Sequence, residues 1–306
     1  FAEDDLVYSV RDITVDGGSI ELEKDDFYSL EDSTRVKTPE KNRGISKITV
    51  IKEATIANRA QKVYILGDSL VAIYYGEPVG GYTTNGLVGT ARTGWGQVIH
   101  NFISDDVDVL DLANSGQWAA GLKETAFTCV MQSARKGDYM ILEAGWNDVK
   151  YSSKAEMKQA IIDMAETCEA KGVIPVLVTP NSSAQTFSAG KNTQYAAVMR
   201  EAASEMKAKY DDVIFVDLAE LSYEFLKETY NSDTDAMNKN INLGYAGSSS
   251  VTGEKGDMLH LSYLGAMKYA ELVAQSMCDQ GVPFINKDFV WSIEDKSGNT
   301  VSVQVK

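Results

Sequence analysis

The sequence predicts an α/β fold in which helices cover both faces of a five-stranded parallel sheet, giving three layers. From about residue 63 to residue 281, short apolar segments alternate with longer segments whose apolar residues have helical spacing. The apolar segments are hydrophobic almost throughout, which is typical of strands covered on both faces. A series of such strand–helix units favours a parallel, doubly wound sheet with right-handed crossovers.

Five segments are expected to form the sheet, because they are rich in β-branched and large apolar residues. The expected strands are Val63–Leu66, Val107–Leu112, Tyr139–Leu142, Ile174–Val178 and Val213–Val216. Pro175 has no amide hydrogen, so it fits the fourth segment only if it lies near the start of the strand.

The clearest helix is expected over residues 154–171. Ser153 and Glu156 have the spacing of a capping box, and Gly172 supplies a C-terminal stop. Further helices are expected at Trp95–Phe102, at Lys123–Arg135, at about Asn192–Tyr210, and from Ser262 to Gly281.

Both ends of the chain differ from this pattern, and we predict three parts: residues 1–61, 62–281 and 282–306. The first has short β-like segments at Val7–Thr14, Ser19–Glu23 and Lys47–Glu53, separated by turn-prone residues. It is interpreted as a small β-rich module that either packs on the main domain or binds carbohydrate. The last part has a hairpin pattern. It either packs on the N-terminal module or begins a neighbouring one.

The composition excludes several classes of function. The net charge of −15 argues against nucleic acid and anionic membrane surfaces as partners, and no apolar segment is long enough to span a bilayer.

The three cysteines, Cys129, Cys168 and Cys278, lie in expected helices and are interpreted as buried thiols rather than disulfides or zinc ligands. No signal peptide is expected within the chain, and its start at Phe1 suggests a mature or trimmed form.

Four polar motifs lie at the ends of predicted strands or before the last helix. Gly67-Asp68-Ser69 follows the first strand, and Asn114-Ser115-Gly116 follows the second. Gly145-Trp146-Asn147-Asp148 follows the third, and Asp257-Met258-Leu259-His260 forms a loop before the last helix. In a doubly wound sheet the site forms outside the carboxyl ends of the strands. Each motif alone also fits a polar loop or a helix cap, but their shared location favours one site.

Ser69 is the candidate nucleophile. A helix is expected directly after Gly67-Asp68-Ser69, so Ser69 would lie where backbone N–H groups are unpaired. A serine in that position has an anion-binding site beside it. The alternative is a polar cap between a strand and a helix.

Together these motifs resemble the SGNH subgroup of the GDSL esterases, and within it the rhamnogalacturonan acetylesterase branch of carbohydrate esterases. The resemblance covers about residues 63–280 and includes Thr93-Gly94-Trp95-Gly96, which is similar to a Gly-Trp-Gly segment of that branch. It implies a flavodoxin-like sheet and secretion from the cell.

The resemblance also implies the roles of five residues. Ser69, Asp257 and His260 resemble the catalytic triad, and Ser69, Gly116 and Asn147 resemble the oxyanion hole. The chemistry agrees, because His260 would move the Ser69 proton while Asp257 orients the imidazole. No metal or organic cofactor is required. Asp257 could instead cap the last helix, and Asn147 could be a turn residue.

Three other polar features are given structural interpretations. His100 lies on an expected helix and is interpreted as a packed or surface residue. Asp148 is expected to cap or brace its loop. Asp233-Thr234-Asp235 has a faint resemblance to a calcium loop, but the remaining ligand spacing is absent.

Substrate binding is assigned to aromatic residues and to the segment Val71–Arg92, which is long and rich in Gly, Tyr and Thr. This segment is expected to form part of a substrate rim. The candidates for stacking on sugar rings are Tyr74, Tyr75, Tyr82, Trp118 and Trp146. Packing in the core is the competing interpretation for each.

These observations predict a serine esterase that removes acetyl groups from plant cell-wall polysaccharide such as rhamnogalacturonan, pectin or xylan. The acidic composition does not favour a strongly anionic backbone, so xylan or another neutral glycan stays open. The alternatives are a GDSL lipase or thioesterase acting on small acyl esters, and a carbohydrate-binding protein without turnover. The expected partner is an acetylated polysaccharide or oligosaccharide. The oligomeric state is left open.

Overall fold

The computed structural model describes residues 29–31, 34–36, 60–74, 92–244, 256–286, 289–294 and 300–304. The N-terminal segments expected at Val7–Thr14, Ser19–Glu23 and Lys47–Glu53 lie outside these residues. Within the first 59 residues the structure describes an antiparallel pair, β1 (Ser29–Glu31) and β2 (Thr34–Val36).

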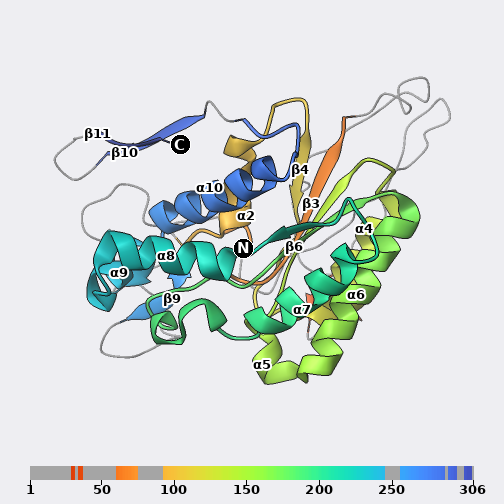
Figure 1. Cartoon of the computed structure of the whole chain (residues 1–306), viewed down its shortest axis with the longest axis horizontal. Helices are drawn as coiled ribbons and strands as arrows, with labels where there is room; N and C mark the ends of the chain where they lie inside the picture. Colours follow the sequence, from red (N-terminus) through yellow and green to blue (C-terminus); the bar gives the residue numbers. More distant parts are fainter. Residues whose placement is uncertain are drawn as a thin grey trace.

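A five-stranded parallel sheet forms the centre of the molecule, as predicted (Figure 1). Its order is β4-β3-β5-β6-β7, and each neighbouring pair is parallel. The strands are β3 (Lys62–Leu66), β4 (Asp108–Asp111), β5 (Tyr139–Glu143), β6 (Ile174–Val178) and β7 (Ile214–Val216). Pro175 is the second residue of β6, as its missing amide requires.

The chain reverses its direction across the sheet at β3. β4 pairs with one edge of β3 and β5 with the other, so β3 lies at the topological switch point. Crevices outside the carboxyl ends of strands form at such points. The residues that follow β3, β4 and β5 therefore come together at one place.

Helices cover both faces of the sheet, which gives three layers (Figure 1). Alternate strand residues point to opposite sides: Val63 and Ile65 join one core, while Tyr64 and Leu66 join the other. The first core contains α2 (Trp95–Val98), η3 (Ile99–Phe102), α8 (Leu218–Tyr230), α9 (Thr234–Asn240) and α10 (Tyr263–Asp279). The second contains α3 (Ala119–Leu122), η4 (Lys123–Phe127), α4 (Thr128–Ser133), α6 (Lys154–Lys171) and α7 (Ala196–Lys207).

The helix α6 has the predicted bounds and the predicted ends. Ser153 Oγ accepts a hydrogen bond from Glu156 N at 3.2 Å, and Glu156 Oε2 accepts one from Ser153 N at 2.8 Å. Gly172 ends the helix in the left-handed region with φ 74°. The capping box and the C-terminal glycine were therefore sufficient to predict both ends of α6.

The helix expected at Lys123–Arg135 has a different form. A continuous run of helical turns begins earlier, at Ala119, and includes a π-helical segment, η4, between α3 and α4. The prediction at Trp95–Phe102 also divides into α2 and the 3-10 helix η3. Two helices, α8 and α9, and the short turns α5 (Asp148–Tyr151) and η5 (Phe187–Asn192) were not predicted.

The segment before the last helix is a strand rather than the expected loop. β9 (Asp257–Leu261) pairs antiparallel with β8 (Asn242–Gly244). Asn242 pairs with Leu261 and Gly244 with Asp257, with an irregularity between them. This two-stranded ribbon carries His260 in a fixed backbone before α10 begins.

The predicted C-terminal hairpin is present as β10 (Val290–Glu294) and β11 (Thr300–Gln304). Trp291 is buried in the core that contains α10, and Phe289 packs edge-on against Phe102 with ring centroids 5.0 Å apart. The hairpin therefore contacts the main domain through its first strand. The three-part division of the chain, and packing of the hairpin on the N-terminal module, stay predictions.

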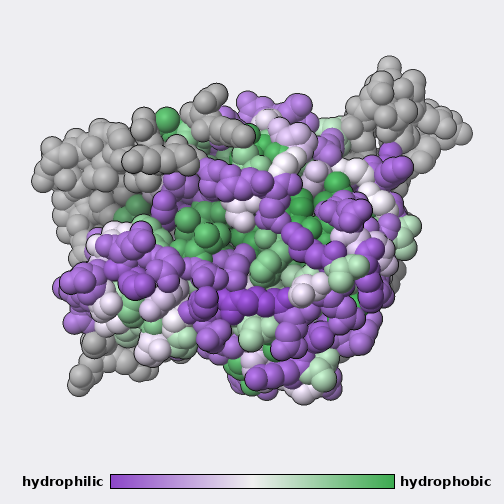
Figure 2. Space-filling model, viewed as in Figure 1, coloured by the Kyte–Doolittle hydropathy of each residue, from purple (hydrophilic) through white to green (hydrophobic). Residues whose placement is uncertain are grey.

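Hydrophilic residues cover much of the face viewed in Figure 2, and hydrophobic residues gather in its middle. Among the described residues, no helix is both long and apolar enough to cross a membrane.

Two of the three cysteines, Cys168 and Cys278, are buried free thiols, while Cys129 is partly exposed.

Candidate active site

Ser69 lies in a tight turn directly after β3. Val71 N and Ala72 N both donate to Asp68 O, at 3.1 and 3.0 Å, and Leu70 N donates to Asp68 Oδ1 at 2.9 Å. The expected helix does not begin here, because residues 69–72 form a turn and bend. The turn satisfies the backbone locally and leaves the Ser69 side chain at the carboxyl edge of the sheet.

The turn requires glycine at position 67 because there is no room for a side chain, and not because of a left-handed φ. A Cβ at this position would lie 2.6 Å from Val71 Cγ2 and 3.2 Å from Glu143 Oε2. Any larger residue would push the turn away from β5. The glycine of the Gly-Asp-Ser motif thus allows the turn that carries Ser69 to pack tightly against the sheet.

The structure brings Ser69, His260 and Asp257 together although 191 residues separate the first two. His260 Nε2 lies 3.0 Å from Ser69 Oγ, and His260 Nδ1 lies 2.7 Å from Asp257 Oδ2. All three residues are buried. This is the order of contacts that a serine nucleophile, a general base and an orienting carboxylate require.

Asp257 is held as a carboxylate by the strand that carries His260. Its Oδ1 accepts the backbone N–H groups of Leu259 and His260 at 3.0 and 2.9 Å. Burial acts to raise the pKa of Asp257, but the hydrogen bonds and charge of His260 and these N–H groups outweigh it, so the pKa is lowered. The pairing with His260 is therefore between an ionised acid and the imidazole Nδ1–H.

Two backbone N–H groups are available for an oxyanion. Among the described residues, none accepts a hydrogen bond from the N–H of Ser69 or of Gly116. Gly116 has φ +78°, and no atom lies within 4 Å of where its Cβ would be. Gly116 is exposed, and its left-handed φ is one that favours glycine.

Asn147, the third predicted donor, is held in place by two acceptors. Its Nδ2 donates to Asp68 Oδ2 and to Gln117 O, each at 3.0 Å. Because both amide hydrogens are used, Asn147 can donate to an oxyanion only by giving up or sharing one of these bonds. These bonds also link the loops that follow β3, β4 and β5.

Three buried acidic groups lie beneath these loops. Burial raises the pKa of Asp68 to about 7 and raises the pKa of Glu143 well above its usual value. Asp148 is fully buried, and its carboxylate accepts the N–H groups of Ala119 and Gly145 at 3.0 and 2.9 Å. Asp148 therefore braces the loop, as expected.

Arg92 was not identified from the sequence as a site residue, except as the end of the predicted rim segment. Its Nη2 lies 2.5 Å from His260 Nε2, and its guanidinium lies over the Tyr74 ring, 4.5 Å from the centroid. Arginine can only donate hydrogen bonds, so Nε2 is the acceptor and the imidazole proton is on Nδ1. The remaining rim residues, 75–91, lie outside the described residues, and Tyr75 and Tyr82 are among them.

The three aromatic residues proposed to bind substrate have different surroundings. Tyr74 donates to Ser69 O at 2.7 Å and contacts Ser115 Oγ at 3.1 Å, so it joins two loops of the site. Trp118 is partly exposed and lies beside Tyr151, with centroids 5.0 Å apart. Trp146 is only 8% exposed and packs with Leu70 and Leu259, so it offers little surface to a sugar ring.

The other candidates have structural positions. His100 is exposed and its Nδ1 contacts Gln97 O at 3.0 Å. Asp233 caps α9 by accepting from Asp235 N and Ala236 N. No group of three acidic, histidine or cysteine side chains suited to a metal occurs in the described part of the chain.

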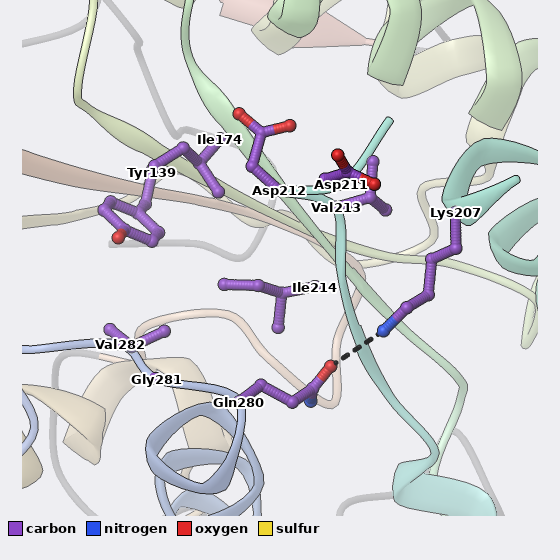
Figure 3. Close-up of a pocket in the computed structure, with 10 residues that line it drawn as sticks. All are labelled: Tyr139, Ile174, Lys207, Asp211, Asp212, Val213, Ile214, Gln280, Gly281 and Val282. Carbon is purple, nitrogen blue, oxygen red and sulfur yellow. Dashed lines mark hydrogen bonds between the residues drawn. The ribbon is translucent and has the colours of Figure 1, made fainter. Parts of the chain in front are cut away.

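A hollow of about 320 Å³ lies at the opposite edge of the sheet (Figure 3). It is lined by Tyr139, Ile174 and Ile214, from the first residues of three strands, and by Gln280 after α10. Lys207 Nζ donates to Gln280 Oε1 at 3.2 Å across its rim. Because it lies at the amino ends of the strands, this hollow is separate from the site of Ser69.

The chain is similar to two curated proteins of Bacillus subtilis (strain 168). The chain is 27% identical over 246 residues to the uncharacterized esterase YxiM of Bacillus subtilis (strain 168). The matched region covers 77% of this chain and 56% of YxiM. It is 29% identical over 214 residues to the rhamnogalacturonan acetylesterase RhgT of the same organism, covering 66% of this chain and 87% of RhgT. The chain thus spans little more than half of YxiM.

The crystal structure of YxiM matches with a TM-score of 0.58 at 26% identity, over 74% of this chain and 58% of that chain. A family model described as GDSL-like Lipase/Acylhydrolase matches residues 63–273, which includes every residue of the triad and of the predicted oxyanion hole. Because this match covers more than half of the chain, the protein belongs to the GDSL-like lipase/acylhydrolase family.

Proposed function

We propose that this protein is a serine esterase that removes acetyl groups from polysaccharide or oligosaccharide. The observation that carries the proposal is the continuous contact from Asp257 through His260 to Ser69, at 2.7 and 3.0 Å. Family membership supports ester hydrolysis in general. The relative RhgT, a rhamnogalacturonan acetylesterase, supports the choice of acetylated carbohydrate.

The mechanism follows from these contacts. Ser69 Oγ attacks the ester carbonyl while His260 Nε2 accepts its proton, and Asp257 stabilises the imidazolium that forms. The Ser69 and Gly116 N–H groups and the Asn147 amide bind the developing oxyanion. His260 then returns the proton to the departing sugar hydroxyl. A water molecule, activated by the same imidazole, hydrolyses the acetyl-enzyme and regenerates Ser69.

Acetate release from a panel of acetylated glycans tests the proposal. The panel contains acetylated xylan, acetylated rhamnogalacturonan oligosaccharides, a small chromogenic acetate and a long-chain acyl thioester. Wild-type protein is expected to release acetate from at least one glycan, and Ser69→Ala to release none. Ser276→Ala, which makes the same change on α10 away from the site, is the matched control.

Two results would contradict the proposal. Undiminished acetate release by a folded Ser69→Ala protein would exclude the serine mechanism. Turnover of the thioester alone, with no activity on any acetylated glycan, would favour a thioesterase instead.

We also propose that the protein acts outside the cell, because polymeric glycans do not cross membranes. Fractionation of the source cells tests this location.

A further inference from the structure

The hollow at the amino ends of the strands has an apolar floor. Four aliphatic side chains form this floor, those of Ile174, Val213, Ile214 and Val282. The volume of about 320 Å³ lies at the lower end of the roughly 300–1,000 Å³ that ligand pockets have. The hollow is therefore of a size for a ligand with a single small ring.

Polar side chains surround this floor. Figure 3 shows them on three sides: Tyr139 on one, Asp211 and Asp212 on another, and Lys207 with Gln280 on the third. The lysine ammonium and the tyrosine hydroxyl can donate hydrogen bonds, and the two carboxylates can accept them. A ligand in the hollow would thus meet both donors and acceptors around an apolar surface.

The Tyr139 hydroxyl is available to a ligand. The residue is only 7% exposed, and its ring is fixed against Phe284, with centroids 4.8 Å apart. Among the described residues, none forms a hydrogen bond with this hydroxyl, although buried tyrosine hydroxyls usually have a partner. Burial raises the pKa of the Tyr139 hydroxyl, and the charge of Asp212 raises it further. The hydroxyl therefore stays protonated and can donate.

Lys207 is held at the rim of the hollow by Gln280. Its Nζ donates to Gln280 Oε1 at 3.2 Å. The same amide accepts from Phe215 N at 3.1 Å and donates to Phe215 O at 2.8 Å, so β7 fixes its orientation. An ammonium group has three N–H donors, and no other described residue accepts one from Lys207. Two donors thus remain for a ligand.

A neutral sugar unit is the ligand that best fits this arrangement. A sugar ring has an apolar C–H face, and each hydroxyl at its edge both donates and accepts hydrogen bonds. These hydroxyls can accept from Tyr139 and Lys207 and donate to Asp211 and Asp212. The two carboxylates would repel an anion, an organic cation would leave the donors unpaired, and an apolar ligand would leave every polar group unpaired.

We propose that this hollow is a second carbohydrate-binding site, which holds one neutral sugar unit of a polymer whose acetylated unit lies at Ser69. The choice of ligand rests on the proposed function, but binding requires no turnover. Tyr139 and Glu143 are the two ends of β5, about 13 Å apart at about 3.3 Å per residue, and Ser69 lies at the Glu143 edge of the sheet. A monosaccharide ester cannot fill both sites, whereas a polymer can, and the second contact strengthens its binding.

Native gel electrophoresis through soluble polysaccharide tests the site. The probes are soluble xylan and soluble galactan, both free of acetyl groups, so that no substrate is consumed. At least one of them is expected to retard the wild-type protein. Tyr139→Phe and the double variant Lys207→Met/Asp211→Asn should each raise the dissociation constant by about three- to tenfold, because they remove hydrogen bonds to the sugar. The double variant keeps the net charge of −15, so its mobility without polymer is comparable.

The matched control is Lys227→Met/Glu224→Gln, which makes similar changes to an exposed pair on α8. It should be retarded as strongly as wild type. Kinetics give a second readout, the ratio of kcat/KM on the acetylated form of the retarding polymer to kcat/KM on the small chromogenic acetate. This ratio should fall by about three- to tenfold in the hollow variants and keep its wild-type value in the control.

The proposal is overturned if neither polymer retards wild type, or if both hollow variants are retarded as strongly as wild type while melting at the same temperature. The second result would mean that any retention arises elsewhere on the molecule. Failure of the proposed function has a different signature. In that case wild-type protein hydrolyses neither the acetylated polymer nor the chromogenic acetate, while its retardation and the loss of retardation in the hollow variants are still observed.

Discussion

At the scale of single residues, the contact between Asn147 and Asp68 determines how the proposed oxyanion hole is oriented before substrate binds. The Asn147 amide donates to Asp68 Oδ2 and Gln117 O, so its orientation is set before substrate binds. Preorganised donors of this kind contribute most when charge develops in the transition state. The amide is thus expected to act on the chemical step rather than on substrate affinity.

Replacement of Asn147 tests this expectation. Asn147→Ala should lower kcat by about 10²–10³ with a much smaller change in KM, because the lost donor serves the transition state. Asn147→Asp should be at least as damaging, since a carboxylate would repel the oxyanion. It would also repel Asp68, whose Oδ2 lies 3.0 Å from the Asn147 Nδ2 in the wild-type protein. Steady-state kinetics on a soluble acetate ester measure both values, and thermal melts check folding. A higher KM with unchanged kcat would restrict Asn147 to substrate binding.

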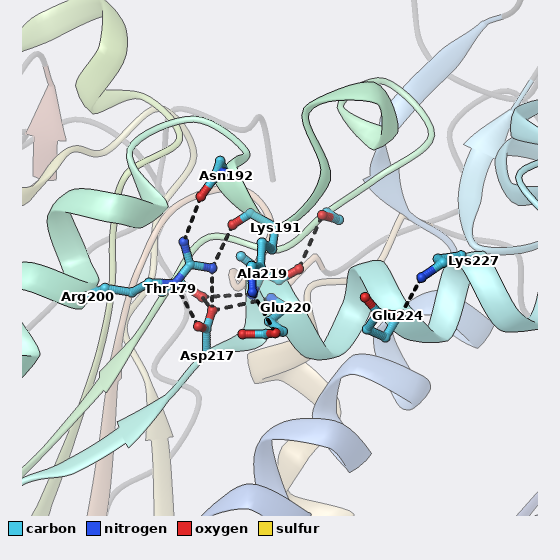
Figure 4. Close-up of polar contacts among 10 residues, drawn as sticks. Thr179, Lys191, Asn192, Arg200, Asp217, Ala219, Glu220, Glu224 and Lys227 are labelled. Atoms are coloured by element: carbon cyan, nitrogen blue, oxygen red, sulfur yellow. Dashed lines mark hydrogen bonds and ion pairs between the residues drawn. The ribbon is translucent and has the colours of Figure 1, made fainter.

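At the scale of elements, the start of α8 shows how the carboxyl edge of the sheet is held (Figure 4). Asp217 follows β7 and accepts from Glu220 N, which caps α8. The Arg200 fork binds the same carboxylate, with Nε–Oδ2 at 2.7 Å and Nη2–Oδ1 at 2.8 Å. Thr179, after β6, adds an Oγ1 contact to Asp217 at 3.3 Å. One side chain therefore joins β6, α7 and α8.

Substitution of Asp217 should separate the cap from the ion pair. Asp217→Ala is expected to lower the free energy of unfolding by about 2–4 kcal/mol, because it removes the cap and leaves the partly buried Arg200 without its carboxylate. Asp217→Asn keeps a capping oxygen and should cost about half as much. Urea unfolding measures these differences, and kcat/KM should not change.

The matched control lies on the same helix. Glu224 pairs with Lys227 at 3.1 Å on the exposed face of α8, with both side chains about half exposed. Glu224→Ala should leave stability within experimental error, because exposed pairs are screened by water and salt. Equal losses for Asp217→Ala and Glu224→Ala would refute the assignment of Asp217 as a joint between elements.

The sequence predicted those elements whose signals are local. The period of α6, its capping box and the apolar residues of β6 are each contained in a single stretch, and both elements have the predicted bounds. The start of α8 carries a similar local signal, because Glu220 follows Asp217 at the spacing of a capping box, although no helix is predicted there. The sequence predicts a loop where β9 forms, because the strand depends on pairing with β8, which lies 13 residues or more away along the chain.

The sequence predicted which motifs lie at the site, but it did not predict every contact that their side chains make. Ser69, Gly116, Asn147, Asp257 and His260 follow strands or precede a helix, and the switch point of the sheet gathers them. Arg92 carries no such signal. Its contact with His260 joins positions 168 residues apart and depends on how the chain returns to the site. The catalytic roles of the five residues stay predictions that the variants above test.

At the scale of the whole molecule, buried acids beneath the site should make stability depend on pH. Asp68 and Glu143 are each 1% exposed, and burial is the main cause of their raised pKa values. In the unfolded chain Glu143 ionises near its usual value of 4.5, but in the folded protein it keeps its proton to a higher pH. Between these values the folded state binds more protons, so the free energy of unfolding falls as pH rises.

Glu143→Gln should remove much of this dependence, because glutamine does not titrate. Wild-type protein is expected to lose stability between about pH 5 and pH 8, by up to about 1.4 kcal/mol per pH unit for each proton involved. The variant should show a shallower decline over the same range and be the more stable protein at its alkaline end. Asp68, whose pKa is raised to about 7, contributes the slope that remains.

Urea unfolding at half-unit steps of pH measures the slopes of the two proteins. Glu124→Gln removes the same charge from the exposed surface, so its slope should match that of wild type. If Glu143→Gln and wild type have parallel slopes, Glu143 does not take up a proton on folding, and the buried acids must be stabilised as carboxylates instead. Because Asp68 accepts a hydrogen bond from the Asn147 amide, that result would also mean that this donor of the proposed oxyanion hole is held by a permanent negative charge. No change of pH in this range would then weaken the contact.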